Sequence, residues 1–218
     1  VAIGRNALIT QNFTTATDNY NVAVGYSAGG LVTTAIRNTL IGGISGDALT
    51  TGARNTTLGY ATLSSDTLGS RTVAIGYEAL GSQNFTTSTN AYNVAVGYSA
   101  GNVVTTGIQN TIIGALAGDA LTDADGNVAV GFGALTTNQL GSKSVAIGRD
   151  ALSSQNPDTA TDMYNIAIGE DAGHLVSTGV QNTIVGGLAG DAITTGTTNT
   201  AVGYASLGAN QTGINNAC

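Results

Sequence analysis

The hydrophobic and polar positions of this chain are arranged around a recurring glycine. The phrase Asn-Val-Ala-Val-Gly at residues 93–97 recurs at 21–25 and 127–131, and in looser forms elsewhere. In all twelve versions the residue before the glycine is Ile, Val or Leu, and the residue three positions before it is Val, Thr or Ile. Alternating β-branched positions that end at a glycine predict a short strand with one buried face, followed by a bend.

The spacing of these glycines defines two nested periods. Successive glycines are 21, 17, 17 and 17 residues apart, and this order repeats every 72 residues, which predicts super-repeats at 1–72, 73–144 and 145–216 within one repetitive segment, 1–218. A glycine at such a bend indicates positive φ or a close backbone neighbour. The twelve are Gly4, Gly25, Gly42, Gly59, Gly76, Gly97, Gly114, Gly131, Gly148, Gly169, Gly186 and Gly203. Because the chain opens and closes in mid-phrase, we expect it to be an excerpt of a longer fibre chain.

An asparagine stands four residues before the glycine in most turns, with Thr72 and Ser144 as exceptions. Equivalent residues of stacked coils lie about 4.8 Å apart, so their amides can form a ladder and satisfy the backbone of a turn. We therefore interpret this column as structural. Its members are Asn21, Asn38, Asn55, Asn93, Asn110, Asn127, Asn165, Asn182 and Asn199.

These columns predict an all-β fold, a parallel β-solenoid (β-roll) of about twelve coils. No helical periodicity extends beyond a turn, and glycine recurs too often for helices. Separate hairpins are disfavoured because the same phrase returns in the same orientation at a nearly constant coil length. Every fourth coil carries four extra residues, within 11–20, 83–92 and 155–164, and these insertions should project from one edge.

Charge and composition narrow the classes of partner. The net charge is −7 with only six Lys and Arg residues, which are too few to assemble a basic patch, so we expect no nucleic-acid partner and no attraction to anionic membrane surfaces. No apolar run approaches about 18 residues, which argues against membrane insertion. The single Cys218 is either another small core residue or the site of an interchain disulfide.

The inventory for catalysis and metal binding is thin. His174 occupies a variable turn position, and no Cys/His metal spacing exists. Asp47, Asp119 and Asp191 share a column but lie four coils apart, too far to hold one cation, and residues 123–127 lack the closing Glu of a calcium loop. We therefore expect no catalytic residue, cofactor or metal ion, and a protein that is not an enzyme.

Two sets of side chains are candidates for contacts with other molecules. The aromatic residues of the insertions either form a recognition surface for a host glycan or protein, or cover corners of the coil; they are Phe13, Tyr20, Phe85, Tyr92 and Tyr164. A leucine column either packs against sister chains or fills the corner of its own roll; it comprises Leu8, Leu63, Leu80, Leu135, Leu152 and Leu207.

The phrases Thr-Val-Ala-Ile-Gly at residues 72–76 and Ser-Val-Ala-Ile-Gly at 144–148 resemble the head repeats of YadA-like trimeric autotransporter adhesins. They are also similar to the Asn-Thr-Ala-Ile-Gly-Tyr repeats of phage tail-fibre shafts. The resemblance implies a left-handed β-roll, a homotrimer, and an extracellular location on a cell surface or virion. The coils are longer here than in that family and carry regular insertions.

From these observations we expect a non-enzymatic structural segment of an extracellular fibre or adhesin that supports attachment to a host or surface. The alternatives are a self-assembling filament without a receptor and an ice-binding solenoid. An ice-binding array is disfavoured because adjacent strand residues point to opposite faces, so Thr33-Thr34 directs only one hydroxyl outward.

Overall fold

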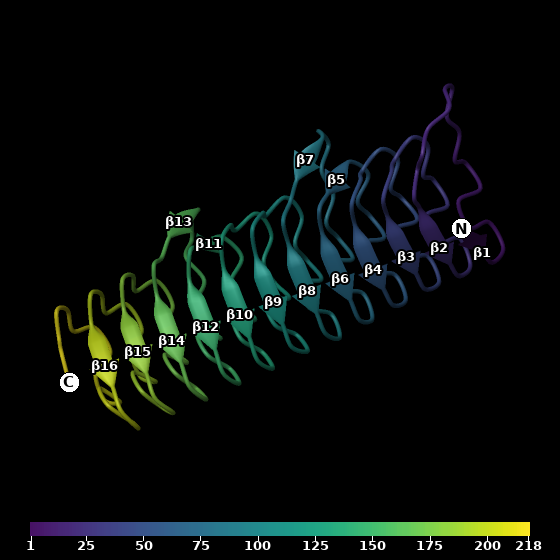
Figure 1. The fold of residues 1–218 in the computed structure, drawn as a ribbon. Coiled ribbons are helices and arrows are strands. Elements are labelled where there is room, and N and C mark those ends of the chain that lie inside the picture. The colour runs from purple at the N-terminus through teal and green to yellow at the C-terminus, as the bar shows by residue number, and fades with distance from the viewer.

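The computed structural model describes all residues 1–218 and contains strands, turns and bends but no helix. The chain forms an elongated stack of coils with the two termini at opposite ends (Figure 1). This confirms the prediction of an all-β parallel solenoid of about twelve coils. Nothing in the structure is a helix long and apolar enough to cross a bilayer.

One long parallel sheet contains a strand from each coil. Its strands, in spatial order, are β1 (Ala2–Ile3), β2 (Val22–Val24), β3 (Thr39–Ile41), β4 (Thr56–Leu58), β6 (Val73–Ile75), β8 (Val94–Val96), β9 (Thr111–Ile113), β10 (Val128–Val130), β12 (Val145–Ile147), β14 (Ile166–Ile168), β15 (Thr183–Val185) and β16 (Thr200–Val202). Two short sheets lie beside it, β5 (Gly69–Ser70) with β7 (Thr89–Asn90) and β11 (Gly141–Ser142) with β13 (Thr161–Asp162).

The register of the long sheet is set by the repeated phrase. Val22 pairs with Thr39, 17 residues on, whereas Ile75 pairs with Val96, 21 residues on. The four extra residues therefore leave the sheet unchanged and are accommodated outside it.

The recurring glycine brings the backbones of adjacent coils close together. All twelve have φ between 121° and 145°, a region that side-chain-bearing residues rarely adopt. A Cβ on Gly114 would lie 2.5 Å from the carbonyl oxygen of Gly131 in the next coil. Both a positive φ and a close neighbour therefore restrict this position to glycine. Gly203, at the end of the stack, has no atom within 4 Å of its Cβ position.

The asparagine column joins the coils through side-chain hydrogen bonds. In each of the nine residues, Oδ1 accepts a hydrogen bond of 2.8–3.0 Å from the backbone N–H 17 residues later. Each Nδ2 donates to the carbonyl 14 residues later, at 2.7–3.0 Å. All nine side chains are buried, and each satisfies two backbone groups that would otherwise be buried without partners.

A glutamine completes the ladder where asparagine is missing. Gln83 is fully buried, accepts a hydrogen bond from Asn93 Nδ2 at 2.8 Å, and donates to Thr72 Oγ1 at 3.2 Å. Gln155 accepts from Ser144 Oγ at 3.2 Å and from Asn165 Nδ2 at 2.9 Å. The longer coils thus supply an amide from the insertion itself.

The leucine column lies inside the single chain. Leu63, Leu80, Leu135 and Leu152 are fully buried, and Leu8 and Leu207 are partly buried against the same core. The alternative in which these leucines face sister chains is therefore wrong, because the coil encloses them. Cys218 is exposed and unpaired, whereas Ala74 and Ala146 in the equivalent position are fully buried.

Large and small residues alternate in the core with the four-coil period. The position of Leu80 is glycine in the next two coils, and there Ile112 fills the space from the centre of β9. A Cβ on Gly101 would lie 2.8 Å from Ile112 Cδ1 and 3.0 Å from Leu80 Cδ2. The 72-residue period therefore reflects size compensation in the core as well as the insertions.

We predict that Gly114→Ala destabilises the solenoid through both strain and overlap. The left-handed backbone costs about 1–3 kcal/mol for an L-residue, and the clash with Gly131 adds about 1–3 kcal/mol. Urea unfolding of Gly203→Ala is the control, because it retains the strain without the clash. Equal losses for the two variants would contradict this account.

We also predict coupling between Leu80 and Gly101. Leu80→Ala should cost about 2–5 kcal/mol by leaving a cavity, and Gly101→Ala should overpack the same region. The double variant should be more stable than the sum of the two losses predicts, by about 0.5–3 kcal/mol, since the added methyl occupies the vacated space. Additive free energies of unfolding would show that the two positions do not share a volume.

Candidate functional site

The three insertions project from one edge of the solenoid. Figure 1 shows the segment before β2 and the strands β7 and β13 rising above the long sheet on the same side. The second and third insertions pair with the preceding coil as the short sheets β5–β7 and β11–β13. This edge is where the regular coil is interrupted and is the candidate functional site.

The structure divides the predicted aromatic surface into two groups. Tyr20, Tyr92 and Tyr164 are 66%, 48% and 50% exposed, and Phe13 is half-buried. Phe85 is only 5% exposed, so its assignment to a recognition surface is wrong. Its carbonyl accepts a hydrogen bond from Thr67 Oγ1 at 3.0 Å, which holds it against the preceding coil.

Two of the exposed tyrosines contact a cation from the preceding coil. The Arg71 guanidinium lies 5.4 Å from the ring centroid of Tyr92 and donates a 2.9 Å hydrogen bond to its hydroxyl. Lys143 Nζ lies 5.4 Å from the ring centroid of Tyr164 and also forms a 2.6 Å ion pair with Asp162. Such cation–π contacts fix the ring orientation at a modest gain in energy.

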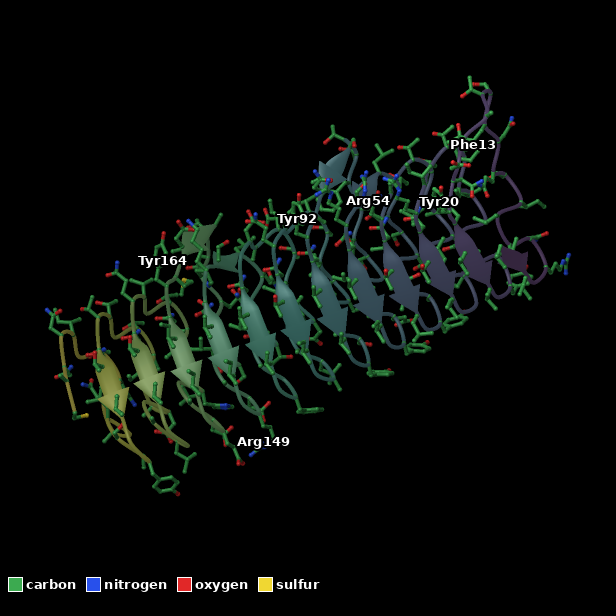
Figure 2. All side chains as sticks on the ribbon, in the orientation of Figure 1. Phe13, Tyr20, Arg54, Tyr92, Arg149 and Tyr164 are labelled. Atoms are coloured by element: carbon green, nitrogen blue, oxygen red, sulfur yellow. The ribbon has the colours of Figure 1, made fainter.

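Sequence reasoning missed a row of arginines on this edge. Arg37, Arg54 and Arg71 occupy the same position on three successive coils, directly before the asparagine column, and all three are exposed. We call them the arginine ladder. Tyr20 precedes it and Tyr92 follows it in the same column, and Figure 2 shows Tyr20, Arg54 and Tyr92 along one edge.

The arginine ladder corrects the expectation that no basic patch can form. It gathers three of the six cationic side chains of the protein in one column. None of the three forms a salt bridge, since the ion pairs of the structure involve Lys143, Arg149 and His174. The signal in the sequence was the 17-residue spacing of these arginines, which a count of total charge does not reveal.

A buried carboxylate lies beneath the second insertion. Asp66 Oδ2 accepts a 2.7 Å hydrogen bond from Gln83 Nε2, and Oδ1 accepts a 2.9 Å bond from the Gly69 N–H. Burial raises the pKa of Asp66 above its ordinary value, and these hydrogen bonds only partly oppose the shift. The equivalent residue of the next super-repeat is Asn138, which is buried and uncharged.

The residues that resemble a catalytic group do not have catalytic geometry. Ser153, His174 and Asp191 lie in one column, and Ser153 Oγ is 2.9 Å from His174 Nδ1. The same Nδ1 is 3.6 Å from Asp171 Oδ1, whereas a Ser-His-Asp triad uses opposite ring nitrogens for the serine and the carboxylate. This arrangement is a hydrogen-bonded turn on the surface.

The acidic positions are also used by the fold. Asp119 accepts a 2.7 Å hydrogen bond from Thr136 Oγ1, and Asp125 Oδ1 accepts a 2.7 Å bond from the Ile108 N–H. No group of three or more His, Cys, Asp or Glu side chains is positioned to hold a metal ion.

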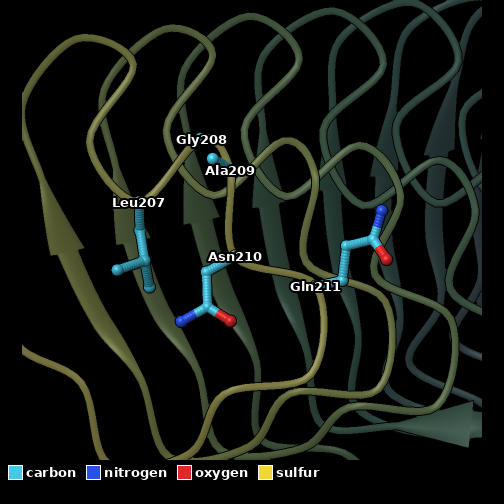
Figure 3. Close-up of a pocket in the computed structure, with 5 residues that line it drawn as sticks. All are labelled: Leu207, Gly208, Ala209, Asn210 and Gln211. Atoms are coloured by element: carbon cyan, nitrogen blue, oxygen red, sulfur yellow. The ribbon is translucent and has the colours of Figure 1, made fainter.

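The largest hollow lies at the end of the stack. It has a volume of about 650 Å³ and is lined by Leu207, Gly208, Ala209, Asn210 and Gln211 (Figure 3). The equivalent leucines of inner coils, Leu135 and Leu63, are fully buried by the coil that follows them. The hollow is therefore the uncovered interior of the last coil.

The fold and this edge define the class of molecule as a parallel β-solenoid with periodic edge insertions. The chain matches no protein-family model, no curated protein and no solved structure.

We predict that Asp66→Asn removes a pH-dependent part of the stability. Because the folded pKa is raised, the folded protein binds this proton more tightly than the unfolded chain. Asp66 therefore destabilises the fold increasingly as pH rises from the ordinary value of 3.8 through the folded pKa. Free energies of unfolding measured across this range should shift in favour of the variant as pH rises. Asn138→Asp is the matched reverse change and should give the opposite trend; a difference independent of pH would contradict the assignment.

Proposed function

We propose that this chain is a non-enzymatic structural segment of an extracellular fibre or adhesin, which supports attachment to a host or surface. The observation that carries the proposal is an exposed apolar face on a long regular stack. The last residue of every strand in the long sheet is aliphatic and points outward. This aliphatic column comprises Ile3, Val24, Ile41, Leu58, Ile75, Val96, Ile113, Val130, Ile147, Ile168, Val185 and Val202, all of which are exposed or half-buried.

The aliphatic column supports association with sister chains. Parallel sheets are normally covered on both faces, and a contiguous exposed apolar patch marks an interaction surface. Twelve coils at about 4.8 Å give a face roughly 55 Å long. With a width of about 12 Å it offers on the order of 700 Å² per chain, which is close to the area that a specific interface buries on each partner.

Aromatic side chains border the same face. Tyr60, Tyr77 and Tyr98 follow the glycines of three successive coils, with ring centroids 5.6 Å and 5.4 Å apart. Stacked rings form a continuous flat margin, and tyrosine is enriched at protein interfaces. We further propose the homotrimer and the left-handed coil that the resemblance to YadA-like adhesin heads and tail-fibre shafts implies.

A second candidate is a self-assembling filament, which the distribution of charge along the stack favours. Residues 1–72 contain four arginines and three carboxylates, whereas residues 145–218 contain one arginine and six carboxylates. Opposite ends of two copies would therefore attract one another. An ice-binding face is not favoured, because the aliphatic column carries no hydroxyl and Thr33 Oγ1 donates to the Thr50 carbonyl at 3.1 Å.

We predict that the wild-type chain is a trimer and that Ile75→Asp combined with Ile113→Asp converts it to a monomer. Both side chains lie in the aliphatic column, where a charge would be buried without a partner in the assembly. Light scattering coupled to size exclusion measures the mass, and circular dichroism checks the fold.

The matched control adds the same charges on the insertion edge, as Asn84→Asp with Gln181→Asp, and should leave the trimer intact. A wild-type monomer at all concentrations would refute self-association. An open-ended, salt-sensitive series of masses would instead favour the filament.

A further inference from the structure

We propose that the arginine ladder, Arg37, Arg54 and Arg71, is a binding site for a linear anionic polysaccharide that carries a carboxylate on its sugar units. This inference deepens the proposed attachment role, on which it rests for its biological setting, and names a ligand class for the insertion edge.

The backbone holds the three arginines in equivalent conformations. Their φ angles are 60°, 61° and 63°, in the left-handed region, which places each side chain at a turn on the outside of the coil. Successive coils repeat at about 4.8 Å, so the guanidinium groups share one direction and one spacing. Each can form a bidentate pair with a carboxylate, a geometry that lysine does not offer.

Stability does not account for the ladder. Three like charges at this spacing repel one another, and no carboxylate of the chain is paired with them. The same column accommodates Gln109, Gln181 and Thr198 in the other super-repeats, with φ of 60°, 59° and 55°. The fold therefore accepts neutral residues at this position, and an external anion would relieve the repulsion.

The surroundings of the ladder suit a sugar chain. Tyr20 and Tyr92 end the column on either side, about 19 Å apart across four coils, and both rings are exposed. Aromatic faces pack against sugar rings, and the Thr39 and Thr56 side chains, on the strands next to Arg37 and Arg54, present hydroxyls that can bond to sugar hydroxyls. Figure 2 shows Tyr20, Arg54 and Tyr92 in one row on the side from which the insertions project.

The charge balance favours a polysaccharide over a nucleic acid. Duplex DNA carries one negative charge per about 1.7 Å, and three cations on a chain of net charge −7 would neutralise little of it. An extended uronate chain carries its charges at the interval of one sugar, which is close to the rise of one coil. Three well-placed guanidinium groups can then meet three carboxylates.

The experiment measures binding of oligogalacturonate to the full chain by isothermal titration calorimetry. Wild type should bind with an affinity that falls as salt is added. The methyl-esterified oligomer, which has the same backbone without the charge, should bind at least about tenfold more weakly. Arg37→Gln, Arg54→Gln and Arg71→Gln in combination should reduce the affinity for the acid form by at least about tenfold.

A matched variant separates the ladder from total charge. Arg5→Gln, Lys143→Gln and Arg149→Gln in combination removes the other three cations and the same net charge, and should retain binding. Conversely, Gln109→Arg with Gly126→Arg places two arginines before Lys143, between Tyr92 and Tyr164, and should create a second site. Gly126 has space for the new side chain, since the nearest atom to its Cβ position is Lys143 Cγ at 3.8 Å.

Three outcomes would overturn the proposal: equal binding of the acid and ester forms, unchanged affinity after loss of the ladder, or tighter arginine-dependent binding of single-stranded DNA. The mass of each variant is measured in parallel. A ladder variant that remains a trimer but no longer binds identifies the ladder as the site. A wild type that binds as a monomer would instead refute the association proposed for the aliphatic column and leave the ladder supported.

Discussion

Stacking in register is the constraint on which every other feature of this molecule depends. In a parallel solenoid the nearest neighbour of a residue is its own equivalent one coil away, so each side chain must fit against copies of itself. At the bend, the carbonyl of one glycine fills the space that a Cβ of the preceding glycine would need. At the start of the strand, an amide can use both its donor and its acceptor between coils, which favours asparagine. Strand, bend and ladder therefore recur together.

That constraint explains why the main elements were readable from the sequence. The position of the strand, the glycine bend and the asparagine column were visible as fixed residue types in fixed columns, and the stacking of coils followed from them. The leucine column was ambiguous, because a periodic apolar residue can face inward or outward and only the path of the coil decides between the two. Phe85 was misplaced for the same reason: its surroundings come from an adjacent coil and not from its own.

Other features lie beyond what a single-sequence pattern can show. Each coil contains left-handed turn positions occupied by ordinary residues, including Leu80, Tyr92 and Arg54, at φ of 51°, 53° and 61°. Such residues are uncommon in the left-handed region, so propensity alone would not place them there. The arginine ladder depends on one of these turns. Its charges are dispersed along the sequence and become neighbours only when the coils are counted.

The pairing of β6 with β8 shows that the solenoid counts coils and not residues, because a 21-residue coil advances the sheet by the same single strand as a 17-residue coil. The added segment is anchored at a buried glutamine on one side and returns to the asparagine ladder on the other. Loop closure becomes only slowly more costly as a loop lengthens. The insertion edge can therefore change in length and sequence during evolution while the pitch of the rod stays constant, so that what the molecule recognises is inherited separately from how far it reaches.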